Sequence, residues 1–126
     1  MAPLTKAPTE GDILKFDLDK NFTREVVTLL EGTNYKIGSV LGRITASEKY
    51  KLATATGSDG AQNAGGVLIE AVDASDGDRT GVIIKRGPAI VAKSALVFDE
   101  SVDDAPKTEA KLTQLVAMGI VARETA

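Results

Sequence analysis

Cysteine, histidine and tryptophan are absent from this sequence of 126 residues, and aromatic residues make up only 4% of it. Without cysteine the chain can form neither disulfides nor thiolate zinc sites. Without histidine it has no imidazole metal ligand, no histidine general base and no Ser-His catalytic triad. Few common enzyme mechanisms remain, so we expect a protein that is not an enzyme and that needs no cofactor or metal.

A strong excess of charge of either sign is also missing. Fifteen basic residues face 18 acidic ones, which gives a net charge of -3. Such a chain has no positive field to attract nucleic acid or an anionic bilayer. No apolar run approaches the roughly 20 residues that span a membrane, and the first residues lack the pattern of a secretory signal. We therefore expect a soluble protein, made in a cytoplasm, with no nucleic-acid or membrane partner.

The composition changes once along the chain, near Phe22. Residues 1–21 contain Pro3, Pro8 and many small or charged residues, which bury too little apolar area to offset the entropy of ordering them. We interpret residues 1–21 as a flexible arm and residues 22–126 as one β-rich domain, which is long enough to keep a single core. Removal of residues 1–20 is then expected to leave the stability nearly unchanged.

Short apolar or alternating segments typical of β-strands dominate the chain after residue 22. They span residues 24–32, 39–46, 48–55, 67–72, 81–87, 89–92 and 119–124. The glycine, serine and asparagine residues of 56–66 predict a long mobile loop. The sequence thus predicts a mainly β fold, built as a small barrel or sheet.

Only residues 103–119 have clear helical signals. Asp103 or Asp104 can cap the first amides, Pro106 suits the first turn, and Gly119 can end the helix. Leu112, Leu115 and Val116 recur at spacings of three and four, which places one apolar stripe against the sheet. The domain should therefore carry one C-terminal α-helix.

Two loops contain residues that could bind ions. Asp73, Asp76 and Asp78 lie close to glycines, as calcium ligands do, but their spacing does not fit an EF-hand, and a solvated hairpin turn is favoured. The segment "GSDGAQNAGG" could approach a phosphate through its backbone amides. It lacks the Lys-Ser/Thr pair of a P-loop and no helix follows it, so a flexible loop is favoured.

Two residue pairs could in principle do acid-base or nucleophilic chemistry. Asp17 and Asp19 share one face of a strand, yet nothing in a flexible arm would desolvate one of them and raise its pKa. Lys93 and Ser94 are adjacent, and adjacent residues on a strand point to opposite faces. Neither pair forms a convincing catalytic site.

Three long segments together resemble the head decoration protein family of lambda-type tailed bacteriophages. They are "REVVTLLEGTNYKIGSVLGRITASEKYKLA", "AGGVLIEAVDASDGDRTGVIIKRGPAIVAKSALVF" and "KTEAKLTQLVAMGIVARE". The resemblance covers nearly the whole chain after Phe22, and the order of its short apolar elements, including "KIGSVLGRIT" and "VIIKRGPAIV", makes it specific.

The resemblance implies a β-clip-like fold and a homotrimer that cements the capsid. Such a protein would lie on the outer surface of the virion, bind the major capsid protein after the shell expands, and resist the pressure of the packaged DNA. It would be assembled in the host cytoplasm. In the family the N-terminal arm is disordered in the free protein and ordered on the shell, and no catalytic residue is carried over.

The arm contains one segment patterned like a strand, "DILKFDLDK". Its apolar side chains Leu14, Phe16 and Leu18 alternate with Lys15, Asp17 and Asp19. Such a strand can add to the sheet of another protein, and this reading is favoured over pairing within its own domain. We therefore predict a capsid-binding arm formed by Leu14, Lys15, Phe16, Asp17 and Leu18.

The alternative function from another class is a small trimeric receptor- or glycan-binding module of a phage tail or spike. Such a module would need a groove lined by aromatic side chains, and this chain has few aromatics.

Overall fold

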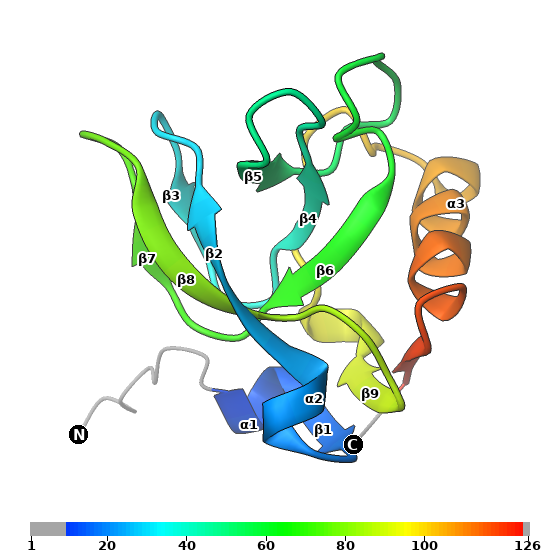
Figure 1. Cartoon of the computed structure of the whole chain (residues 1–126). Coiled ribbons are helices and arrows are strands. Elements are labelled where there is room, and N and C mark those ends of the chain that lie inside the picture. The colour runs from blue at the N-terminus through cyan, green and yellow to red at the C-terminus, as the bar shows by residue number, and fades with distance from the viewer. Residues whose placement is uncertain (1–9, 125–126) are drawn as a thin grey trace, which may run out of the picture.

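Five strands close into a small barrel in the computed structural model, which describes residues 10–124 (Figure 1). In their order around the barrel, they are β2 (Arg24–Leu29), β5 (Tyr50–Leu52), β4 (Val40–Arg43), β6 (Ala64–Leu68) and β8 (Arg79–Ile84). Neighbours are antiparallel except β2 and β5, which are parallel and pair only at Leu29 and Tyr50. Closure leaves few free strand edges in this part of the molecule.

A second sheet of three strands lies below the barrel in the view of Figure 1. Its order is β1 (Leu14–Asp17), β9 (Ala89–Ala92) and β10 (Ile120–Arg123). β1 is antiparallel to β9, whereas β10 is parallel to it. A separate two-stranded sheet joins β3 (Asn34–Tyr35) to β7 (Val72–Asp73).

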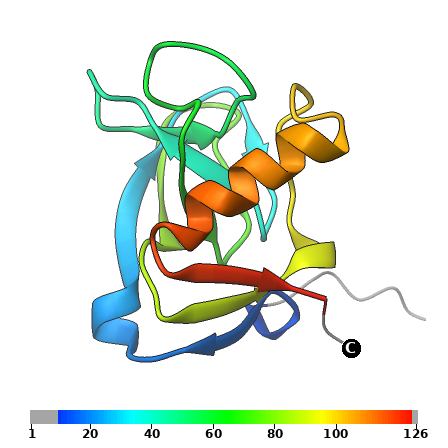
Figure 2. The same ribbon diagram turned by 90° about the vertical axis from the view of Figure 1, so that its right-hand side faces the viewer.

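The helix α3 (Ala105–Val116) begins and ends where its capping residues predict. The Asp104 carboxylate accepts a hydrogen bond from the Lys107 amide at 3.0 Å, and Pro106 occupies the first turn. Gly119 follows the helix with φ of 83°, a conformation that glycine adopts without strain. Leu112 and Leu115 are buried, and the helix lies against β6 and β10 (Figure 2).

Two glycines fix the distance between β9 and the end of α3. A β-carbon at Gly87 would lie 1.7 Å from the carbonyl oxygen of Gly119, so no side chain fits there. The Gly87 amide donates to the Met118 carbonyl at 2.8 Å, and the Ala89 amide donates to the Gly119 carbonyl at 3.2 Å. This close backbone contact places β10 beside β9.

The core has two parts. The smaller cluster lies in the barrel and includes Leu29, Leu41, Leu68 and Ile83. The larger cluster joins the barrel to the second sheet and α3, and its fully buried members are Ile13, Val40, Val67, Ile84, Val91, Leu115 and Ile120. Ile13 comes from the single turn α1 (Glu10–Ile13), so the N-terminal segment contributes to the main core.

A buried lysine connects α3 to the loop before β6. Lys111 is 2% exposed, and its ammonium group donates to the carbonyl of Gln62. Burial lowers the pKa of Lys111. The Gln114 side-chain oxygen accepts from the Ala64 amide at 2.7 Å. The helix thus holds the loop that ends at residue 63.

The predicted fold class is confirmed: the domain is mainly β, with one C-terminal helix of several turns. Some boundaries differ. β6 starts at Ala64, inside the predicted loop 56–66, because Ala64 and Gly66 pair with β4. Single turns at α1, α2 (Lys20–Thr23) and the 3-10 helix η1 (Lys93–Ala95) were not predicted.

The favoured interpretation of "DILKFDLDK", a strand that adds to another protein instead of pairing within its own domain, is wrong in its second part: residues 14–17 form a strand of the domain. β1 pairs with β9, which lies about 75 residues later in the sequence, and the Leu18 amide donates to the Pro88 carbonyl at 3.1 Å. The boundary at residue 22 therefore separates no structural unit within the described residues. Residues 1–9 of the predicted arm lie outside the described residues, so the flexibility of that part of the arm stays a prediction.

Candidate functional site

Three of the most exposed large apolar side chains lie within seven residues of one another. Phe16 is 47% exposed on β1, Leu18 is 63% exposed just after it, and Phe22 is 52% exposed on α2. β1 and α2 meet at one end of the molecule (Figure 1). We call Phe16, Leu18 and Phe22 the apolar corner. Grouped exposed apolar residues are typical of interaction surfaces, and two of the three phenylalanines of the chain lie here.

The backbone beside the apolar corner can also bind a partner. β1 is the terminal strand of the sheet β1-β9-β10, so within the described residues only one of its edges is paired. An edge strand offers unpaired amide and carbonyl groups to an added strand. Among residues 10–124, the corner therefore combines apolar side chains with a strand edge that no other strand pairs.

A register shift in β1 sets which side chains face outward. The pairing with β9 shifts between Leu14 and Phe16, and this irregularity breaks the simple alternation of the strand. Leu14 packs against the core, whereas Phe16 is exposed and Asp17 is turned toward the domain. The predicted common face of Leu14, Phe16 and Leu18 is therefore wrong.

Asp17 lies at the centre of a small polar network. Its side chain is 11% exposed, and its carboxylate accepts from the Thr23 hydroxyl at 2.8 Å and from Nε of Arg24 at 3.2 Å. Arg24 also pairs with Glu10 at 2.6 Å. Burial favours the neutral acid, but the hydrogen bonds from Thr23 and Arg24 and the nearby charges of Arg24 and Lys20 outweigh it and lower the pKa of Asp17.

Phe22 is fixed in place by a basic side chain of the β8–β9 loop. The guanidinium carbon of Arg86 lies 5.4 Å from the centre of the Phe22 ring. The same guanidinium group donates to the Phe22 carbonyl at 2.5 Å and to the Glu25 carboxylate at 2.7 Å. The ring thus contacts Arg86 and still remains 52% exposed.

The residues of the predicted capsid-binding arm take different positions in the structure. Phe16 and Leu18 are exposed, and Lys15 is exposed with its ammonium group donating to the Gly11 carbonyl at 2.8 Å. Leu14 and Asp17 face the domain. Phe22 was missed, although its spacing from Phe16 and Leu18 and the scarcity of aromatics could have drawn attention to it.

The other candidate residues have local structural roles. Asp73 accepts from the Ser75 amide at 3.0 Å, and Asp78 accepts from the Glu31 amide at 2.8 Å and pairs with Lys49 at 2.6 Å. Asp19 caps α2 through the Asn21 amide at 2.8 Å. No group of three or more acidic residues within 10–124 is arranged to hold a metal ion.

Lys93 and Ser94 do not lie on a strand, contrary to our assumption. They begin η1, and the Lys93 ammonium group lies 3.6 Å from the Glu109 carboxylate.

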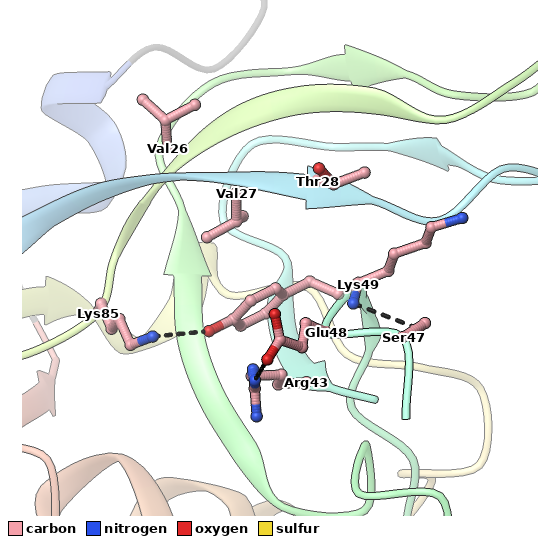
Figure 3. A pocket seen from close by; sticks show the side chains of 9 residues that line it. Val26, Val27, Thr28, Arg43, Ser47, Glu48, Lys49 and Lys85 are labelled. Carbon is pink, nitrogen blue, oxygen red and sulfur yellow. Dashed lines mark hydrogen bonds and ion pairs between the residues drawn. The ribbon is translucent and has the colours of Figure 1, made fainter. Parts of the chain in front are cut away.

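A polar hollow of about 420 Å³ opens where β2 and β5 separate (Figure 3). Among its lining residues, Arg43 pairs with Glu48 at 2.8 Å, and the Lys85 ammonium group donates to the Tyr50 hydroxyl at 3.1 Å. The side chains of Arg43 and Glu48 are 42% and 74% exposed, and that of Lys85 is 30% exposed. The hollow therefore does not bring together two buried charged side chains.

Comparison with known families agrees with this picture. The sequence model of the family described as bacteriophage lambda head decoration protein D matches residues 3–120. The chain belongs to the head decoration protein family. This confirms the predicted family, and membership supports a structural role in decorating a phage head and a location on the capsid of the virion. A search of curated proteins found no significant match. No helix between residues 10 and 124 is long and apolar enough to cross a membrane.

Proposed function

We propose that this head decoration protein forms homotrimers that bind the outer surface of the expanded phage head and stabilise it against the pressure of the packaged DNA. Assembly would take place in the host cytoplasm, and the partner would be the major capsid protein. The observation that carries the proposal is the apolar corner beside the free edge of β1. No other part of the described chain combines an open strand edge with several exposed apolar side chains.

The mode of binding we propose is strand addition to β1. A capsid segment would pair with the open edge of β1 while Phe16, Leu18 and Phe22 close over apolar groups of the capsid. Fully burying one such side chain contributes about 1.5–3 kcal/mol, and these three, which are 47–63% exposed, are already partly buried here. The gain per corner is therefore modest.

Two features would strengthen binding despite this modest gain per corner. Because β1 is already paired with β9, binding need not order its backbone, which would otherwise cost about 1–2 kcal/mol per residue. A trimer would present three corners at once, and later contacts would then be intramolecular and could raise the overall affinity roughly a hundredfold or more. Expansion of the shell moves the capsid subunits, so all three corners should fit only one state of the shell.

Co-sedimentation with capsids tests the proposal. We expect the purified protein to sediment with expanded heads, in multiples of three copies, and to remain in solution with unexpanded precursor heads. The protein bound to expanded heads should also delay their rupture on heating, because a ligand that binds one state stabilises that state by mass action. Equal binding to both forms, or binding to neither, would contradict the proposal.

A further inference from the structure

We propose that Asp17 is a positioning residue for the capsid contact rather than a contact residue itself. Together with Thr23 and Arg24 it forms a brace that holds the apolar corner in one orientation. This inference rests on the proposed function, because it concerns the surface that would meet the capsid. It assigns separate roles to neighbouring residues: Phe16, Leu18 and Phe22 make contact, and Asp17 fixes their direction.

The brace closes the base of a turn. Asp17 ends β1, Thr23 ends α2 and Arg24 begins β2, so the hydrogen bonds from Thr23 and Arg24 to Asp17 join the two ends of the turn at residues 18–22. Two of the three apolar side chains, Leu18 and Phe22, lie on this turn, and Phe16 immediately precedes Asp17. A movement at the base would thus displace all three.

The base is also tied to the rest of the domain. Thr23 is fully buried, and its carbonyl accepts from the Lys85 amide at 2.8 Å. On the other side of the turn the Leu18 amide donates to the Pro88 carbonyl. The brace therefore sets the corner relative to the barrel and the second sheet, and so relative to the other two corners of a trimer.

Burial separates this role from direct contact. Only 11% of the Asp17 side chain is exposed, and Thr23 and Arg24 already occupy its carboxylate. A buried ion pair often adds little stability compared with apolar residues of similar size. A contribution to stability therefore does not by itself explain the ion pair between Asp17 and Arg24. An ion pair with directional hydrogen bonds does, however, define one geometry.

Positioning affects affinity through the fraction of molecules whose corner is correctly oriented. The apparent dissociation constant rises as that fraction falls. If loss of the brace left each corner oriented about one-fifth of the time, one corner would bind roughly fivefold more weakly, and three corners acting together would bind roughly a hundredfold more weakly. A trimer therefore amplifies a small local loosening.

Variants of the brace test the inference. Asp17→Asn removes the charge, and Thr23→Val removes the hydroxyl but keeps the shape, whereas Thr23→Ser restores the hydroxyl. Asp103→Asn is the matched control, because Asp103 forms an ion pair of similar length with Lys107, 2.8 Å, on the exposed surface of another element. Each variant is compared with wild type by amide hydrogen exchange in the free protein and by affinity for expanded heads.

We expect Asp17→Asn and Thr23→Val to accelerate exchange at the Leu18 and Phe22 amides about tenfold through local opening, and exchange at Val67 in the barrel only as far as the global stability falls. Both should bind expanded heads roughly a hundredfold more weakly, while Thr23→Ser and Asp103→Asn behave as wild type. Unchanged exchange at Leu18 and Phe22 would overturn the brace. Exchange at these two amides with the same urea dependence as exchange at Val67 would overturn it too, because the corner would then open only with the whole domain.

The measurement of affinity for expanded heads distinguishes this inference from the proposed function. If the wild-type protein binds expanded heads and Asp17→Asn binds equally well despite faster exchange at the corner, the positioning role is wrong and the proposed function stands. If the wild-type protein does not bind, the proposed function fails, and the role of Asp17 in binding fails with it.

Discussion

At Asp17, opposing effects of burial and hydrogen bonding make stability depend on pH. Burial disfavours the carboxylate, but the hydrogen bonds from Thr23 and Arg24 and the adjacent positive charges lower the pKa of Asp17 below its usual value of 3.8. The folded state therefore favours the ionised form more than the unfolded state does. Ionised Asp17 stabilises the fold above the unfolded pKa, and this contribution is lost as the pH falls through the folded pKa.

This sign gives a prediction for Asp17→Asn. At neutral pH the variant should be less stable than wild type by about 1.5–3 kcal/mol, the usual range for hydrogen bonds to a charged group. The difference should shrink as the pH falls below 3.8 and close below the folded pKa. Urea unfolding at a series of pH values measures it.

A second acidic group does not disturb this comparison. The pKa of Glu25 is also lowered, chiefly by a hydrogen bond from Arg86, but Glu25 titrates in both proteins and cancels in the difference. A gap between wild type and Asp17→Asn that stayed constant down to pH 2 would show that the charge of Asp17 does not stabilise the fold.

At the scale of elements, α1 and β1 are parts of the domain rather than a detachable arm. Ile13 is fully buried in the core, with 0% of its surface accessible to solvent. Leu18, five residues later, is 63% exposed. We therefore no longer expect the stability to stay unchanged when residues 1–20 are removed, and we expect their removal to destabilise the fold. Truncation would remove a core side chain and the strand that pairs with β9.

Two single substitutions separate the core role from the surface role of this segment. Ile13→Ala should lower the free energy of unfolding by about 2–5 kcal/mol, because it leaves a cavity in the main core. Leu18→Ala should change it by less than about 0.5 kcal/mol, because the side chain is mostly in water. Chemical denaturation of both variants measures the contrast, and a stable Ile13→Ala protein would argue that α1 is not packed as described.

The elements that the sequence predicted are those with local signals. Asp104, Pro106 and Gly119 each act within one turn of α3, and they marked its ends correctly. The partner of β1 could not be predicted in this way, since β9 is distant in the sequence and each strand has only four residues. The predicted loop 56–66 extended too far toward the C-terminus, because Gly66 in the sequence indicates flexibility. In the structure Gly66 instead allows close packing against Ile83.

The candidate site was predicted only in part, for a similar reason. Simple alternation placed Asp17 on the same face as Lys15, and the register shift between Leu14 and Phe16 turned Asp17 inward instead. Thr23 and Arg24, which hold it there, had no visible link to it in the sequence. Phe16 and Leu18 are exposed, and their role in capsid binding stays a prediction. Phe22 lies outside the alternating pattern of residues 14–19, so that pattern did not include it.

At the scale of the whole molecule, the proposed binding depends on three equivalent corners of a trimer that act together. One corner buries limited apolar area, so a single protein should bind the head weakly. A trimer converts three weak contacts into one strong one, provided that the capsid places three partner segments at matching positions. In the proposed trimer, a change at one residue would therefore occur three times in each complex.

The affinity of Phe16→Asp for expanded heads, compared with that of Val116→Asp, tests the central claim most directly. Both residues are about half exposed, 47% and 55%, so both variants should fold with nearly the wild-type thermal midpoint, but Val116 lies on α3. Because Phe16→Asp places a charge in a contact that excludes water, we expect its binding to fall roughly a hundredfold or more, and Val116→Asp to bind as wild type does. Undiminished binding by Phe16→Asp would contradict the claim that the apolar corner holds the protein on the head.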